Sequence, residues 1–87
     1  MSSDIVTIEI PEKVLLAEKT DAKTFATELK ILAAVKLYEM RRLSSGRAAE
    51  LAGLSRIEFL LTLSRYQVFP FESELDELEN SYEQSHQ

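Results

Sequence analysis

Residues 44–66 read SSGRAAELAGLSRIEFLLTLSRY, and this stretch decides the fold. It predicts two short helices that meet at Gly53, because glycine readily adopts the left-handed backbone conformation that ends a helix. The small pair Ala48–Ala49 lets another helix approach closely. Ser55 is placed to cap the second helix, and Glu58 three residues later completes a capping box. The pattern is that of a helix-turn-helix, whose second helix can lie in the major groove of DNA.

The length of the chain, 87 residues, allows one domain and is too short for two. Hydrophobic residues make up 45% of it, with only two glycines and two prolines, which predicts a folded and mostly helical chain. A core of this size is marginally stable alone, so we expect association with a second copy or another protein. The sequence has no apolar run of the ~20 residues that a membrane helix needs, and its start lacks the features of a signal peptide. We therefore expect a cytoplasmic protein with no membrane contact.

The charges are unevenly distributed along the chain. The net charge is −5, which argues against a protein that coats nucleic acid. All five arginines lie in residues 41–66, against two glutamates, whereas residues 67–87 carry six acids and no lysine or arginine. Arginine suits phosphate and guanine contacts as well as protein interfaces. The chain therefore divides into a strand plus helix-turn-helix domain, residues 1–66, and an acidic partner-binding tail, residues 67–87.

An alternating pattern over residues 5–10, IVTIEI, predicts a short N-terminal strand with its even-numbered apolar residues on one face. A single strand is not stable, so this one needs a partner, either residues 68–71 or the same strand of a second copy. A two-stranded ribbon that reads DNA is the weaker interpretation, because Glu9 would face the phosphates.

Two further helices are predicted before the helix-turn-helix. Residues 11–18 form a short helix that begins at Pro11, and a longer helix is capped by Thr20 or Asp21 and runs to about Arg42. The expected fold class is thus mainly α. It consists of a short N-terminal strand, a helical bundle that contains the helix-turn-helix, and an acidic C-terminal segment.

Two interpretations of the helix-turn-helix stay open. In the first it binds DNA, with base contacts from Ser55 and Arg56 at the start of the second helix. Phosphate contacts would then come from Ser44, Ser45 and Arg47 at the start of the first helix. In the second interpretation it is a helical hairpin inside a core, since the second helix is apolar nearly all round.

The acidic tail offers large apolar side chains that a partner protein could bury. Segments too weak to fold alone commonly become ordered on a partner surface, and packing back on their own domain is the alternative. The carboxylates of the tail lack the glycine turn and the ligand spacing of a calcium loop, so we predict no metal site. The predicted partner-binding residues are Phe69, Phe71, Leu75, Leu78 and Tyr82.

The sequence offers almost nothing on which catalysis could rest. His86 is the only histidine and stands second from the end, and the chain has no cysteine. Without these residues or a glycine-rich phosphate loop, no pair of nucleophile and base can be assembled. We expect neither an enzyme nor a cofactor.

Three blocks of the chain are informative in combination: VTIEIPE at 6–12, AAVKLYE at 33–39 and GRAAELAGLSRIEFL at 46–60. Together they resemble a family of small prokaryotic helix-turn-helix proteins, which are predicted antitoxins often encoded beside PIN-domain ribonuclease toxins. The resemblance implies the antitoxin of a type II toxin–antitoxin pair, which neutralises its cognate toxin by direct contact. It also implies a homodimer that represses the shared operon through operator DNA, with toxin binding in the C-terminal part.

Two other functions stay open at this point. The first is a stand-alone transcription regulator without a toxin, which uses Arg47, Ser55 and Arg56 on an operator. The second is a structural interaction module that uses its helix-turn-helix for oligomerisation. A neighbouring gene for a small nuclease-like protein would favour the antitoxin.

Overall fold

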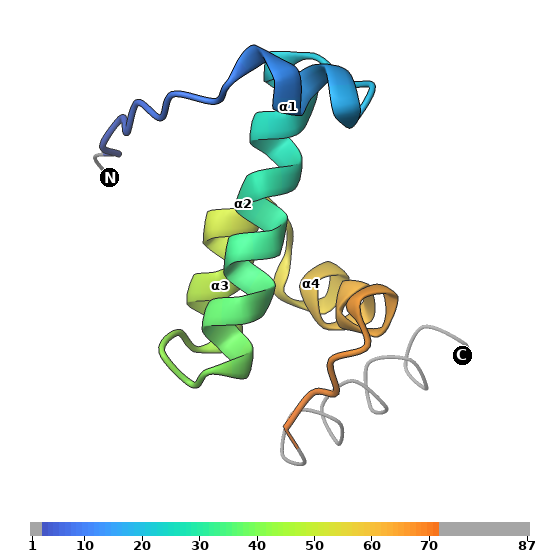
Figure 1. Ribbon diagram of the computed structural model, residues 1–87. Helices are drawn as coiled ribbons and strands as arrows, with labels where there is room; N and C mark the ends of the chain where they lie inside the picture. The colour runs from blue at the N-terminus through green and yellow to red at the C-terminus, as the bar shows by residue number, and fades with distance from the viewer. Residues whose placement is uncertain (1–2, 72–87) are drawn as a thin grey trace.

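The computed structural model describes residues 3–71, and these residues form a mainly helical structure, as predicted (Figure 1). The short first helix and the long second helix fall within the ranges expected from the sequence. No strand forms among the described residues. The elements in chain order are α1 (Glu12–Ala17), α2 (Ala22–Glu39), α3 (Ser45–Ala52), α4 (Arg56–Thr62) and the 3-10 helix η1 (Leu63–Tyr66).

The strand predicted for residues 5–10 is absent from the described chain. These residues run as extended backbone, and Ile5 is 94% exposed. Pairing with residues 68–71 was one of the two expected arrangements, and it is wrong. The Val68 N–H donates to the Leu63 carbonyl and the Phe71 N–H to the Tyr38 hydroxyl, so these donors of the segment are already paired elsewhere. An alternating pattern forms a strand only where a second strand satisfies its backbone groups.

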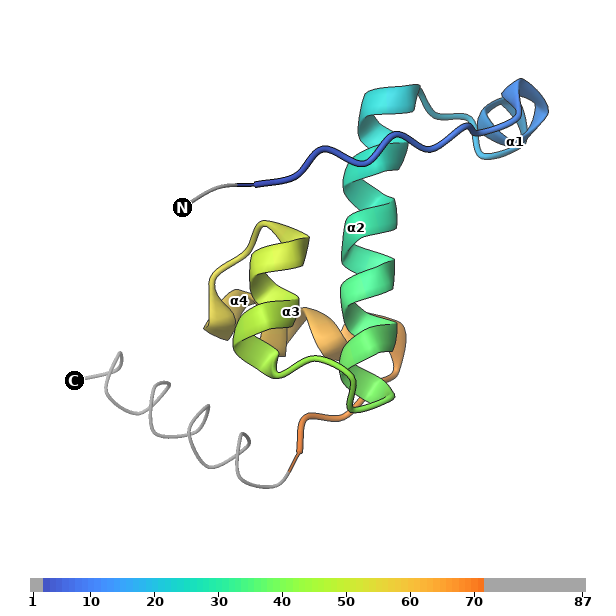
Figure 2. The same ribbon diagram turned by 90° about the vertical axis from the view of Figure 1, so that its left-hand side faces the viewer.

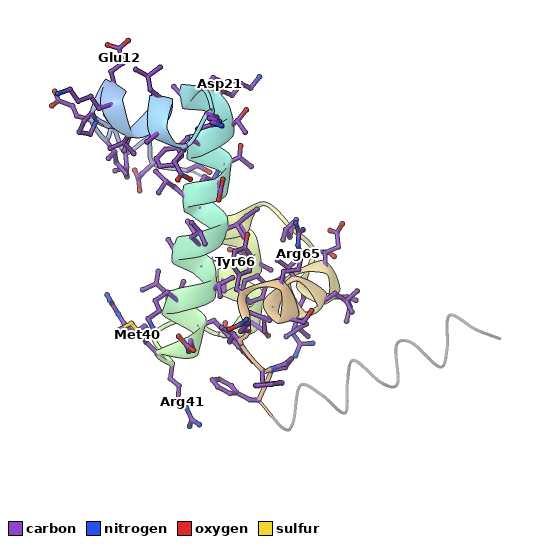
Figure 3. All side chains as sticks on the ribbon, turned by 45° about the vertical axis from the view of Figure 1, so that its right-hand side comes forward. Glu12, Asp21, Met40, Arg41, Arg65 and Tyr66 are labelled. Atoms are coloured by element: carbon purple, nitrogen blue, oxygen red, sulfur yellow. The ribbon has the colours of Figure 1, made fainter. Side chains whose placement is uncertain are left out.

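Both ends of α2 are set by local hydrogen bonds. Asp21 caps the start, because its carboxylate accepts the Thr24 N–H at 2.7 Å. At the other end Arg41 takes the left-handed conformation with φ of 62°, and its N–H donates to the Tyr38 carbonyl at 2.9 Å. The helix therefore ends at Glu39, three residues before the predicted end. Figure 3 shows Asp21 and Arg41 at opposite ends of this helix.

The turn between α3 and α4 follows the prediction in detail. Gly53 has φ of 74°, and the Leu54 N–H donates to the Ala49 carbonyl at 2.9 Å. Ser55 and Glu58 form the expected capping box. The Ser55 hydroxyl accepts the Glu58 N–H at 3.2 Å, and the Glu58 carboxylate accepts the Ser55 N–H at 2.9 Å.

The core lies where the C-terminal half of α2 meets α3 and α4. Small side chains let α2 and α3 approach each other closely, with Ala34 and Ala48 both fully buried. The largest buried side chains are aromatic, and Phe59 meets Tyr38 edge-to-face with ring centroids 5.6 Å apart. α4 is thus a core helix over much of its surface, although Leu61 is 58% exposed.

The N-terminal half of α2 projects beyond this core together with α1 (Figures 1 and 2). None of the buried core residues belongs to α1 or to the first half of α2. The described molecule therefore has a packed end around α3, α4 and η1, and an open end around α1.

Replacement of the two glycines by alanine should change the free energy of unfolding in opposite directions. At Gly53 an added methyl group meets no atom within 4 Å, so the cost of Gly53→Ala is backbone strain at positive φ, about 1 kcal/mol. Gly46 lies inside α3 with similar open space, so Gly46→Ala should stabilise the fold by about 0.5–1 kcal/mol. Urea unfolding of both variants measures the pair. Equal signs for the two changes would contradict the assigned turn geometry.

Acid should destabilise the helix starts. Hydrogen bonds from the Thr24 backbone and hydroxyl lower the pKa of Asp21, and those from Ser55 lower the pKa of Glu58. A lowered folded-state pKa gives stability that is present above the unfolded-state value and is lost as pH falls through the folded one. We expect the melting temperature to fall below about pH 4, and to fall less in the double variant Asp21→Asn, Glu58→Gln, which keeps both caps without titration. Equal losses in the two proteins would contradict this assignment.

Candidate functional site

The N-terminal end of α3 gathers four of the five residues predicted to contact DNA. Ser44 caps the helix, and its hydroxyl accepts the Arg47 N–H at 3.2 Å. Ser45 is 2% exposed, and its hydroxyl accepts a hydrogen bond from Nε of Arg56 at 2.9 Å. This bond joins residues eleven positions apart and ties the first residue of α4 to the first residue of α3.

The electrostatics of this end favour an anion. A helix N-terminus carries partial positive charge from its unpaired N–H groups, and the two arginines add to it. Arg47 pairs with Glu50, whose two carboxylate oxygens lie 3.0 and 3.1 Å from the same guanidinium nitrogen. Both side chains are more than half exposed, so the pair is weak and a phosphate could displace it.

The fifth predicted residue, Ser55, has a structural role in the described chain. Its hydroxyl accepts the Glu58 N–H, and its own N–H donates to the Glu58 carboxylate. The first turn of α4 therefore uses its hydroxyl and its carboxylate to cap the helix. Ser44 likewise caps α3 and Ser45 is buried, so the exposed side chain of Arg47 is the predicted group at the start of α3 that is best placed for a phosphate.

An aromatic cluster at the end of α2 was not predicted from the sequence. The ring of Phe71 stacks on that of Tyr38 with centroids 4.6 Å apart, and the guanidinium of Arg41 lies 4.7 Å from the centre of the Phe71 ring. The Phe71 N–H also donates to the Tyr38 hydroxyl at 2.9 Å. Because 33 residues separate the two, no local spacing could reveal the contact.

The predicted partner-binding residues on the two sides of Pro70 lie in different surroundings. Phe71 packs on the domain, whereas Phe69 is 85% exposed. Val68 is buried, so the packed structure continues past Tyr66 to Phe71. The remaining three, Leu75, Leu78 and Tyr82, lie outside the described residues.

Two searches of the described residues bear on other functions. Within residues 3–71 no three side chains of histidine, cysteine, aspartate or glutamate gather closely enough to hold a metal ion. In the same part of the chain, no helix combines the length and the apolar character needed to cross a membrane.

Comparison with known proteins gives a family match. The model of an uncharacterised protein family, UPF0175, matches residues 1–87. A UPF0175 protein from Archaeoglobus fulgidus is 44% identical over 57 residues, which cover 66% of this chain and 64% of that relative. The chain thus spans slightly less than two thirds of the length of this relative. No solved structure gives a significant match.

Proposed function

The chain belongs to the UPF0175 family, and we propose that it is the antitoxin of a type II toxin–antitoxin pair. In this proposal it neutralises a ribonuclease toxin by direct binding, and as a homodimer it represses its own operon. The resemblance of its three sequence blocks to predicted antitoxins supports the pairing with a toxin. The separation of charge supports a division of labour between the arginine-bearing residues 41–66 and the acidic tail.

One observation carries the DNA-binding part of the proposal: the hydrogen bond between Arg56 and Ser45. It brings a second arginine to the helix end that already holds Arg47, and in this proposal both arginines contact the DNA backbone there. Helix N-termini with nearby arginines are a common means of binding the DNA backbone. Such contacts would position the protein on its operator.

The toxin-binding part rests on Phe69 and on the residues that follow Phe71. A phenylalanine that is 85% exposed beside a rigid proline is a suitable anchor for a partner's apolar pocket. The active sites of PIN domains are carboxylate clusters that hold a divalent metal. Residues 67–87 carry no positive charge, so their acids would be repelled by such a cluster.

We therefore propose that the tail inhibits a PIN-domain toxin without plugging its active site. Phe69 and the apolar residues after Phe71, namely Leu75, Leu78 and Tyr82, would bury themselves in an apolar groove beside that site. A ribonuclease with a basic RNA-binding surface would suit the acidic tail equally well, and here the tail would compete with RNA for that surface.

Binding to promoter DNA tests the operator role. Glutamine is the sharper replacement for Arg56, because its amide nitrogen occupies the position of Nε and can keep the bond to Ser45 while the charge is lost. Arg47→Gln and Arg56→Gln should each weaken binding and lower the slope of log affinity against log salt by about one. Arg65→Gln, on η1, serves as the matched control and should leave the affinity and the salt slope unchanged. Wild-type affinity and slope in the Arg47, Arg56 double variant would overturn the DNA assignment.

A further inference from the structure

The open end of the molecule carries an apolar face that the packed core does not use. Residues 4–10, here called the N-terminal segment, run as extended backbone away from α1 and α2 (Figures 1 and 2). Val6 is 77% exposed and Ile8 is 65% exposed. A groove runs between this segment, α2 and the end of α3, and its apolar lining includes Val6, Ile8, Ile10, Phe25, Leu29 and Leu51.

The backbone N–H and C=O groups of the N-terminal segment are also unpaired within the described chain. Within residues 3–71 they make no hydrogen bond with protein atoms. An extended segment with unpaired backbone groups and alternating apolar side chains is a template for another strand. The unpaired backbone and the apolar groove lining belong to the same residues, because Val6, Ile8 and Ile10 of this segment line the groove.

We propose that the same segment of a second copy covers this face, so that two chains form an antiparallel two-stranded ribbon over the first halves of both α2 helices. The ribbon pairs the backbone groups of each segment that face the other strand. Its apolar side fills both grooves, and the interface is symmetric, as in most homodimers. A ribbon of two strands is weak alone, so packing on α2 supplies most of its stability.

The sequence of the segment selects one register. In an antiparallel pair, directly opposed residues lie on the same face. With the twofold axis at Ile8, this residue opposes its own copy and Val6 opposes Ile10, so the apolar face is continuous. With the axis at Thr7, the carboxylate of Asp4 opposes Ile10 within the ribbon, whereas with the axis at Ile8 it opposes Glu12, beyond Pro11. Pro11 ends the ribbon because it has no N–H to donate.

This interface specifies the homodimer of the proposed function, and it depends on neither DNA nor a toxin. Its test is therefore made on the isolated full chain. If the chain proves not to be an antitoxin, the proposed dimer interface is unaffected. Loss of the interface likewise leaves toxin binding through the tail intact.

A matched pair of lysine variants tests the face. Ile8→Lys puts two positive charges together at the twofold axis on the apolar side, and it should raise the dimer dissociation constant by about a hundredfold or more. Thr7→Lys puts the same charge on the other side, opposite Glu9, and should keep the dimer. Sedimentation equilibrium of the wild type and both variants gives the masses. A dimeric Ile8→Lys would overturn the interface, and a monomeric wild type would overturn the homodimer as well.

Single cysteines test the register independently of folding effects. The natural chain has no cysteine, so any crosslink comes from the introduced residue and its copy. A disulfide needs Cα atoms roughly 4.4–6.8 Å apart, which only residues at the axis satisfy. Ile8→Cys should therefore oxidise to a covalent dimer, and Val6→Cys should not. Crosslinking at Thr7→Cys in place of Ile8→Cys, or at no position from 4 to 10, would overturn the proposed ribbon.

Discussion

Replacing Tyr38 by alanine should lower the free energy of unfolding by about 4 kcal/mol, the largest effect expected of any single change in the described chain. The side chain is fully buried and contacts rings from two other parts of the molecule, Phe59 in α4 and Phe71 after η1. Its removal leaves a cavity and deprives both rings of their neighbour. The total free energy of unfolding of a small domain is about 5–15 kcal/mol, so Tyr38→Ala should be partly unfolded at physiological temperature. Urea titration followed by circular dichroism measures the loss.

Tyr38→Phe is the matched control for this effect. It keeps the ring and removes only the hydroxyl that accepts the Phe71 N–H, so the expected loss is about 1 kcal/mol. The two variants separate packing from hydrogen bonding. If Tyr38→Ala unfolded at the same urea concentration as the wild type, the core described here would be wrong.

Phe69→Ala should weaken binding to the proposed toxin, the product of the neighbouring gene, by about 2 kcal/mol, roughly thirtyfold, with no loss of stability. The side chain is 85% exposed in the single chain, so the fold does not depend on it. Phe71→Ala should behave oppositely, with a loss of stability of roughly 2 kcal/mol, because this ring packs on Tyr38 and beneath Arg41. Calorimetric titration of the toxin and urea unfolding of each variant give the two numbers.

The pair of phenylalanines makes this prediction specific. They flank the same proline and differ in exposure rather than in chemistry. An unchanged toxin affinity for Phe69→Ala would remove this residue from the interface. A loss of stability in Phe69→Ala would show that its surroundings differ from those described.

Features set by neighbours in the chain could be predicted from the sequence. Asp21, Gly53 and Ser55 occupy the helix ends expected of them, because capping depends on residues within one turn. The long helix ends at Glu39 because Arg41 adopts a left-handed conformation that is more typical of glycine.

Features that depend on distant contacts could not be predicted from neighbouring residues. The strand at residues 5–10 needs a second strand, and the single chain has none to offer. The stacking of Phe71 on Tyr38 crosses 33 residues. In the candidate site, the residues at the start of α3 could be predicted from the sequence. The hydrogen bond from Arg56 to Ser45 could not, because it depends on how α3 and α4 cross.

The central claim is that this chain binds and inhibits a ribonuclease. The most direct test is to co-express the full chain with the product of the gene beside its own, to purify the tagged neighbour, and to measure RNA cleavage by the complex and by the neighbour alone. We predict a stoichiometric complex without ribonuclease activity, and an active ribonuclease once the chain is removed. A neighbour that neither binds the chain nor cleaves RNA would contradict the antitoxin role, and promoter binding without such a neighbour would identify a stand-alone regulator.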